Sequence, residues 1–113
     1  GSIGVEYLSL LRRVRFGENR TVSRVRLDVD SRDRHSLRSI TFTNDGSASN
    51  DDLQNLFVQS GRNRVTDIVE SMNGDTVRLV FSPEFLLQQS KRYVFELHAD
   101  VKVGRSKTLK FVI

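Results

Sequence analysis

LRSITFTNDGSASNDDLQNLFVQSGRNR, residues 37–64, is the most patterned stretch of the chain. Ile40 and Phe42 alternate with polar and β-branched residues, which is the spacing of a strand with one buried face. Asn44-Asp45-Gly46-Ser47 ends this strand, because Asn and Asp bond to their own backbone and Gly admits positive φ. A second extended run follows at Leu56-Phe57-Val58. The stretch therefore predicts a strand, a polar loop and a second strand.

A short helical turn is expected between these two strands. Ser49 or Asn50 can cap it, because their side chains accept hydrogen bonds from unpaired N–H groups at a helix start. Asp51 and Asp52 then fall in the first turn, where the helix dipole favours negative charge. We expect this turn near Asn50-Gln54.

The rest of the chain repeats the alternation in short segments. Apolar residues at every second position indicate strands within 21–30, 76–81, 92–103 and 107–113. Gly17–Arg20 reads as a turn, Asn73-Gly74 is the strongest hairpin signal, and Ser82-Pro83 is expected to interrupt its strand. Val5–Phe16 fits either a helix or a strand, and the turn after it favours a strand. About eight to nine strands and almost no helix predict an all-β, antiparallel sandwich.

The order of strand, loop, capped turn and strand also resembles a known family. Residues Thr43 to Leu56 are similar to immunoglobulin-like β-sandwich modules of bacterial cell-surface and secreted proteins. They also resemble the small sandwich domain that accompanies some bacterial sialidases. Gln89–Phe95 and Leu97–Val101 resemble the closing strands of the same modules. The resemblance implies an immunoglobulin-like sandwich in an extracellular or cell-surface protein.

Length and composition limit the possible classes. Gly1-Ser2 looks like the remnant of a cleaved tag, and 113 residues are enough for a single domain over 3–113. The absence of cysteine excludes disulfides, thiolate metal sites and a cysteine nucleophile. No apolar run approaches the roughly 20 residues that a membrane-spanning helix needs.

The formal net charge of +4 comes mostly from arginines that are mixed with acidic residues. Asp28, Asp30 and Asp33, for example, lie among four arginines. Nucleic-acid binding needs basic residues gathered on one face, with exposed aromatic rings for stacking. The aromatic residues fall mostly on inward positions, so we expect a solvated face of mixed charge, with contact to an acidic polymer or an anionic cell surface as the alternative.

Two acidic groups could supply oxygen ligands to a calcium ion. The first is the loop that holds Asn44, Asp45, Asn50, Asp51 and Asp52, and the second is Asp28, Asp30 and Asp33. Neither matches the EF-hand spacing, and turn and cap duties already explain the loop residues. We therefore expect no metal and no cofactor.

No catalytic residue is assigned. His35 falls in a turn and His98 on an outward strand position, so both are expected to be surface histidines. Glu70, Glu84 and Glu96 could pair as acid and base only if the fold brought them together. The glycines stand alone in turns, and none forms a phosphate-binding loop.

These observations predict a non-catalytic structural or interaction module of a bacterial surface or secreted protein. Its partners would be neighbouring domains or copies of itself, joined through strand edges such as Val5–Phe16 or Leu109–Ile113. One alternative is a carbohydrate-associated accessory domain of a secreted glycosidase, although Tyr7 and Tyr93 are the only tyrosines and tryptophan is absent. The other alternative is an arginine-mediated binder of an acidic polymer or nucleic acid.

Overall fold

The computed structural model describes residues 3–8, 17–29, 35–46, 50–88, 91–102 and 111–112. Several expectations therefore lie outside the described residues, namely those for Ser9–Phe16, Asp30, Asp33, Ser49, Leu109 and Ile113.

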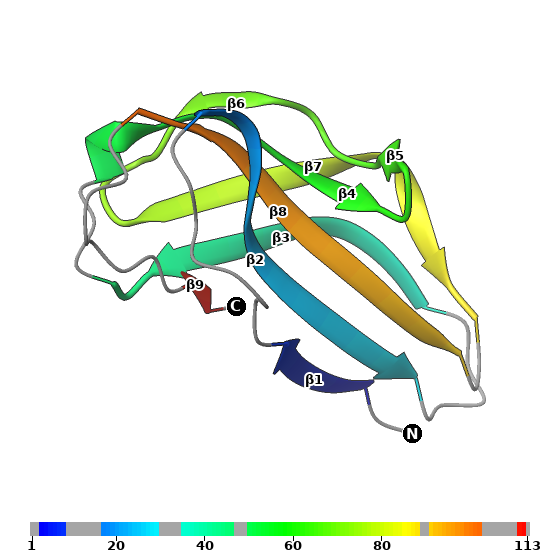
Figure 1. The fold of residues 1–113 in the computed structure, drawn as a ribbon. Helices are drawn as coiled ribbons and strands as arrows, with labels where there is room; N and C mark the ends of the chain where they lie inside the picture. The colour runs from blue at the N-terminus through cyan, green and yellow to red at the C-terminus, as the bar shows by residue number, and fades with distance from the viewer. Residues whose placement is uncertain are drawn as a thin grey trace.

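Two antiparallel β-sheets pack against each other in this all-β fold (Figure 1). The large sheet has the order β1-β2-β8-β4-β5, with β6 also paired to β4, and the small sheet has the order β7-β3-β9. The strands are β1 (Ile3–Leu8), β2 (Gly17–Val29), β3 (His35–Asn44), β4 (Leu53–Ser60), β5 (Asn63–Arg64), β6 (Val69–Ser71), β7 (Thr76–Leu87), β8 (Arg92–Val101) and β9 (Phe111–Val112).

The core lies between the two sheets, where alternate side chains of each long strand meet. The inward positions predicted from the alternation are confirmed on β2, β3, β7 and β8. These strands bury Val25, Leu27, Val29, Ile40, Phe42, Val77, Leu79, Phe81, Phe95, Leu97, Ala99 and Val101. Phe95 is fully buried, and its ring contacts those of Phe81 and Phe85 at centroid distances of 5.6 and 5.0 Å.

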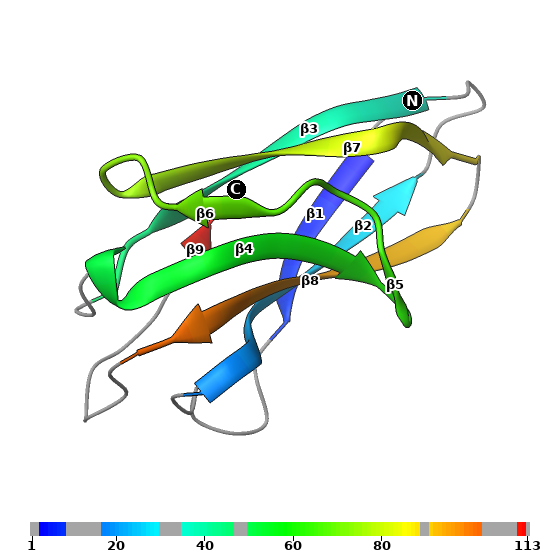
Figure 2. The same cartoon turned by 90° about the horizontal axis from the view of Figure 1, so that it is seen from above.

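When the short strands β5 and β6 are left aside, consecutive strands from β2 to β9 alternate between the two sheets (Figure 2). In an immunoglobulin constant domain, the fifth strand lies between the second and the fourth. Here that position belongs to β8, which is the sixth strand when β1 is counted and β5 and β6 are left aside, and β7 pairs with β3. The immunoglobulin-like topology is therefore not confirmed, although the antiparallel two-sheet architecture is.

The start of β2 differs from the prediction, because Gly17–Arg20 is not a free turn. These residues already belong to β2, whose pairing with β8 shifts register between Gly17 and Arg20 and again between Thr21 and Ser23. Gly17 and Asn19 have φ angles of 132° and 52°, which explains why the sequence looks like a turn. The turn-forming residues here build bulges within a strand.

Two further predictions differ from the structure, namely the helical turn near Asn50-Gln54 and the strand break at Ser82-Pro83. A three-residue 3-10 turn, η1 (Asn50–Asp52), precedes β4, and Leu53 and Gln54 are already strand residues. β7 continues through Pro83, but its pairing with β3 slips there, from Val80 opposite Ser39 to Phe85 opposite Leu37. The predicted turn at Asn73-Gly74 is present, with reciprocal backbone hydrogen bonds between Asn73 and Thr76.

Thr66 joins the two sheets along one side of the sandwich. Its backbone bridges to Phe81 of β7 in the small sheet. Its hydroxyl accepts a hydrogen bond from Val58 N of β4 in the large sheet at 2.9 Å, and donates to Asp67 O at 2.9 Å. Thr66 is only 4% exposed, so this polar contact is part of the core boundary.

Candidate functional site

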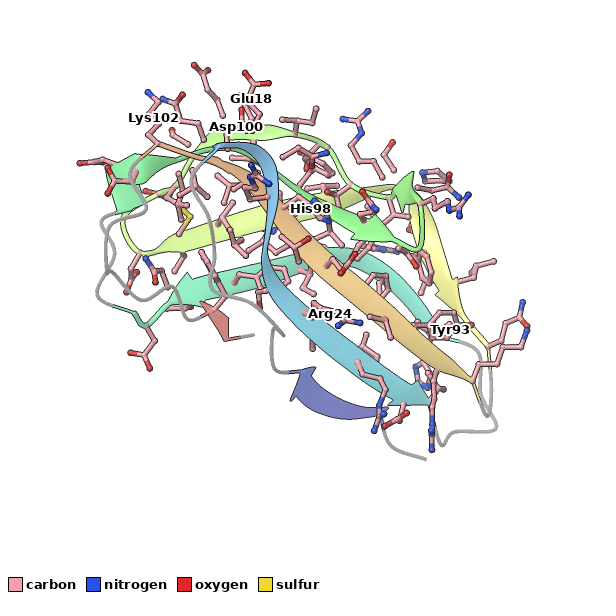
Figure 3. The ribbon with its side chains drawn as sticks, in the orientation of Figure 1. Glu18, Arg24, Tyr93, His98, Asp100 and Lys102 are labelled. Carbon is pink, nitrogen blue, oxygen red and sulfur yellow. The ribbon has the colours of Figure 1, made fainter. Side chains whose placement is uncertain are left out.

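Polar side chains from β2, β8 and β4 contact one another on the outer face of the large sheet, and Figure 3 labels three of them, Arg24, His98 and Asp100. We call this group the outer-face network. It consists of Asn19, Thr21 and Arg24 on β2, Glu96, His98 and Asp100 on β8, and Asn55 on β4. β8 is the central strand of the three, and its alternate residues supply the carboxylates and the imidazole.

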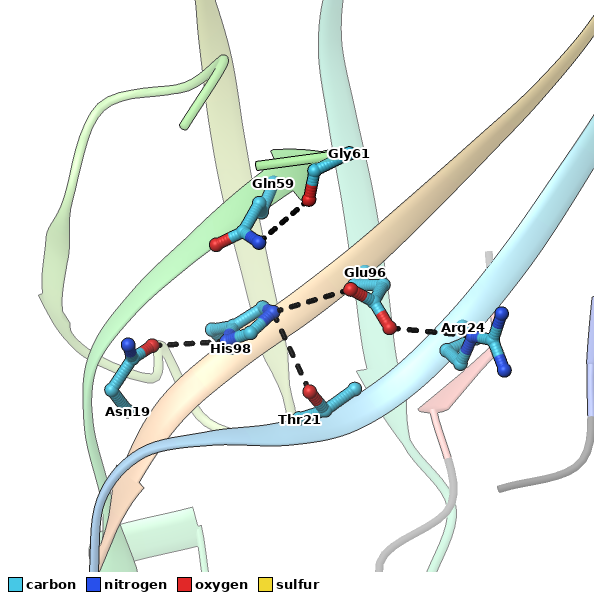
Figure 4. Close-up of polar contacts among 7 residues, drawn as sticks. All are labelled: Asn19, Thr21, Arg24, Gln59, Gly61, Glu96 and His98. Atoms are coloured by element: carbon cyan, nitrogen blue, oxygen red, sulfur yellow. Dashed lines mark hydrogen bonds and ion pairs between the residues drawn. The ribbon is translucent and has the colours of Figure 1, made fainter. Parts of the chain in front are cut away.

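His98 is the centre of the network (Figure 4). Its Nδ1 lies 2.9 Å from Asn19 Oδ1, and its Nε2 lies 3.5 Å from Thr21 Oγ1 and 3.7 Å from Glu96 Oε1. Since an amide oxygen only accepts, Nδ1 carries the hydrogen. The Phe57 ring stacks on the imidazole at a centroid distance of 5.3 Å and an interplanar angle of 16°.

The prediction that His98 is a surface histidine is wrong. Its side chain does point away from the core, but the residue is only 7% exposed, because Asn19, Thr21 and Phe57 surround it. These covering residues come from neighbouring strands, so strand periodicity alone could not reveal them. His35 is half-buried at the start of β3.

The arrangement around His98 differs from that of a catalytic triad. In a triad, an acid or an amide holds one ring nitrogen and the nucleophile contacts the other. Here Asn19 holds Nδ1, but the Thr21 hydroxyl lies 3.5 Å from Nε2, and Glu96 approaches the same nitrogen. His98 is only 7% exposed, and its contacts with Asn19, Thr21 and Phe57 join β8 to β2 and β4.

Asp100 links bulges on both neighbouring strands. Its Oδ1 accepts from Asn19 N at 2.8 Å, and its Oδ2 accepts from Asn55 Nδ2 at 2.8 Å. Both asparagines have left-handed backbone, with φ angles of 52° and 53°, a conformation that Asn tolerates better than most residues. Each lies where the pairing of its strand with β8 shifts register. The Asp100 carboxylate thus stabilises the bulge at Asn19 on β2 and the bulge at Asn55 on β4.

These hydrogen bonds make the contribution of Asp100 to stability dependent on pH. The Asn55 side chain, and then the Asn19 backbone N–H, lower the pKa of Asp100 from its ordinary value of 3.8. Because the folded state has the lower pKa, the stabilisation is complete above the unfolded value and is lost as pH falls through the folded value. Asp100→Asn should therefore cost less than about 1 kcal/mol at neutral pH, since the residue is only partly buried.

Chemical denaturation of wild type and Asp100→Asn, at neutral pH and in acid, measures this effect. The stability difference between the two proteins should shrink in acid, once Asp100 of the wild type is protonated. Glu84→Gln is the matched control, because that carboxylate pairs with Arg38, whose side chain is 82% exposed. A difference for Asp100→Asn that stays constant with pH would contradict the assigned role of its charge.

Further ion pairs lie on the outer face beside the network. The interleaved acidic and basic residues of the sequence predicted such a face of mixed charge. Arg24 pairs with Glu96 at 3.3 Å, and Asp28 lies 3.4 Å from Arg26 and 3.1 Å from Arg92. These side chains are partly exposed, so each pair stabilises the fold only slightly. Arginines and carboxylates on this face thus offset one another.

In its described residues, the loop that could supply calcium ligands makes hydrogen bonds within the fold. Asn44 is buried, and its Oδ1 accepts from Gly46 N at 3.0 Å. The Asp52 carbonyl accepts from Lys102 N at 2.8 Å. Neither here nor elsewhere in the described part do three or more His, Asp or Glu side chains form a group that could hold a metal.

Tyr93, a candidate for sugar stacking, packs against the core. Its hydroxyl accepts a hydrogen bond from Gln88 N at 2.8 Å, and its ring packs edge-on against Phe85 at 5.3 Å. The side chain of Tyr7 lies outside the described residues. The described tyrosine therefore closes one end of the core.

Comparisons with protein-family models, with curated proteins and with solved structures gave no match to this chain. Among the described residues there is no helix of the length and apolar character that crossing a membrane requires.

Proposed function

We propose that the chain is a non-catalytic structural module of a bacterial surface or secreted protein. It joins neighbouring domains or copies of itself. The bacterial and extracellular setting rests on the resemblance carried by Thr43–Leu56.

The structural role is supported by one observation, the burial of His98 among side chains of β2 and β4. Among the described residues His98 is the only buried one with an ionisable side chain. Both of its ring nitrogens contact neighbouring side chains, and Phe57 covers one face of the ring. A group that acts on a ligand must be accessible to it, whereas His98 is only 7% exposed and its contacts join β8 to β2 and β4.

Long-range ¹H–¹⁵N NMR spectra of the imidazoles test this role. We expect His98 in a fixed Nδ1–H form, and we expect its signals to stay unchanged when mixed oligosaccharides or mixed-sequence DNA are added. Signals of His98 and Phe57 that shift on addition of sugar would favour the accessory carbohydrate domain instead. A shift with DNA that disappears with salt would favour the arginine-mediated binder.

Antibody labelling tests the location. In the producing bacterium, the module should be detected on intact cells or in the medium. Detection only after the cells are permeabilised would contradict a surface or secreted role.

A further inference from the structure

The turn between β6 and β7 carries the one Asn-Gly pair of the chain, Asn73-Gly74. Both residues are exposed, and Figure 2 shows the turn projecting from one end of the sandwich. An isolated bridge closes the turn: Asn73 N donates to Thr76 O at 2.8 Å, and Thr76 N donates to Asn73 O at 3.1 Å. A short, solvent-exposed pair of this kind opens more easily than a strand in the core.

The two groups that can react with each other in this turn are not held by hydrogen bonds. Within the described residues, neither the side-chain amide of Asn73 nor the N–H of Gly74 has a partner. Gly74 has a φ angle of 62°, and a Cβ atom placed on it would meet nothing within 4 Å, so the turn is open at this residue. Because glycine has no side chain, its nitrogen can be approached closely.

The other asparagines whose side chains the structure describes lack this combination. Asn19, Asn44 and Asn55 each use their side-chain amide in a hydrogen bond. Asn63 is exposed, but it is followed by Arg64, whose side chain crowds the main-chain nitrogen. An exposed, unbonded amide next to an open glycine nitrogen therefore occurs at one place in the described chain.

We propose that Asn73 is a site of spontaneous deamidation, so that the chain ages chemically at one defined turn. Asparagine is among the thermally labile residues. The nitrogen of Gly74 attacks Cγ of Asn73, the Cγ–Nδ2 bond breaks, and ammonia leaves with the hydrogen of the attacking nitrogen. Water then opens the five-membered imide at either of its carbonyl carbons. The products are aspartate and isoaspartate, in which the main chain runs through the side-chain carboxyl carbon.

The isoaspartate form alters the hairpin, because it adds one carbon atom to the main chain. This addition moves residue 73 out of register with Thr76. The same turn supplies the Asp75 carbonyl, which accepts from Asn44 N at the end of β3 at 2.7 Å. Met72, which precedes the turn, packs against the core. Isomerisation at Asn73 therefore loosens the end of the sandwich where β3 ends and β7 begins.

Peptide mapping by mass spectrometry tests the proposal on protein aged in heavy-oxygen water, at neutral and at mildly alkaline pH. We expect Asn73 to lose ammonia and gain one heavy oxygen atom several times faster than Asn63, the matched exposed asparagine. The rate should rise with pH, because the attack proceeds through the deprotonated nitrogen of Gly74. Both aspartate and isoaspartate should form. Asn73→Gln should stay unmodified, because it would have to form a larger imide ring.

Amide hydrogen exchange of the aged protein measures the structural effect. The amides of Thr76 and Asn44 should exchange about tenfold faster in the isoaspartate form, since each loses a hydrogen bond. The amide of Val58, which bonds to Thr66 away from this turn, should be unchanged. Asn73→Asp carries the new charge on a normal main chain and should exchange like wild type. Asn73 that survives as long as Asn63, or that yields aspartate alone, would overturn the proposal.

Discussion

Phe95→Ala should cost about 3–5 kcal/mol of folding free energy, a large part of the roughly 5–15 kcal/mol that stabilises a domain. Phe95 is fully buried at the middle of β8, and its ring packs against Phe81 and Phe85. Its removal leaves a cavity between the two sheets, which the stiff surrounding strands can only partly fill. Denaturant titration with linear extrapolation measures the loss.

Phe57→Ala is the matched control for this prediction. It removes the same side chain from β4, but from the outer face, where Phe57 is partly exposed and stacks on His98. Its loss should be clearly smaller than that of Phe95→Ala. Equal losses for the two variants would show that the space between the sheets is not the main source of stability.

Thr66→Val should cost about 1–3 kcal/mol, although it hardly changes the volume of the side chain. The substitution removes the hydroxyl that accepts from Val58 N at 2.9 Å, and it leaves this donor buried without its partner. Thr66 lies where the two sheets are joined, so the amide of Val58 should also exchange faster with solvent. Equilibrium unfolding and hydrogen exchange measure the two effects.

Thr41→Val separates the lost hydrogen bond from the general effect of changing threonine to valine. Thr41 is exposed on β3, so the change should alter stability by no more than about 0.5 kcal/mol. If Thr66→Val were as mild as Thr41→Val, the hydroxyl of Thr66 would not join the sheets.

The inward faces of the long strands could be predicted because alternation survives along each of them. The bulges left a weaker signal. Leu53 and Leu56 are both buried but three residues apart, a spacing that breaks the period of two and places the bulge at Asn55. Val22 and Val25 show the same break on β2. Such odd spacings between apolar residues could have revealed both irregularities.

The order of strands in each sheet could not be predicted in the same way. Alternation shows which face of a strand is buried, but not which strand lies beside it. The outer-face network depends on these neighbours: His98 is buried only because Phe57 and Asn19 lie on either side of β8. The resemblance to immunoglobulin-like modules did not predict that β8 would lie between β2 and β4.

Nuclear Overhauser effects between Hα atoms test the position of β8 most directly. Hα atoms approach closely in the non-hydrogen-bonded pairs of an antiparallel ladder, so the structure predicts strong signals between Arg26 and Val94 and between Val58 and Leu97. These signals would place β8 between β2 and β4. Signals that instead join β2 and β4 to Val77 or Leu79 of β7 would contradict the fold and, with it, the outer-face network.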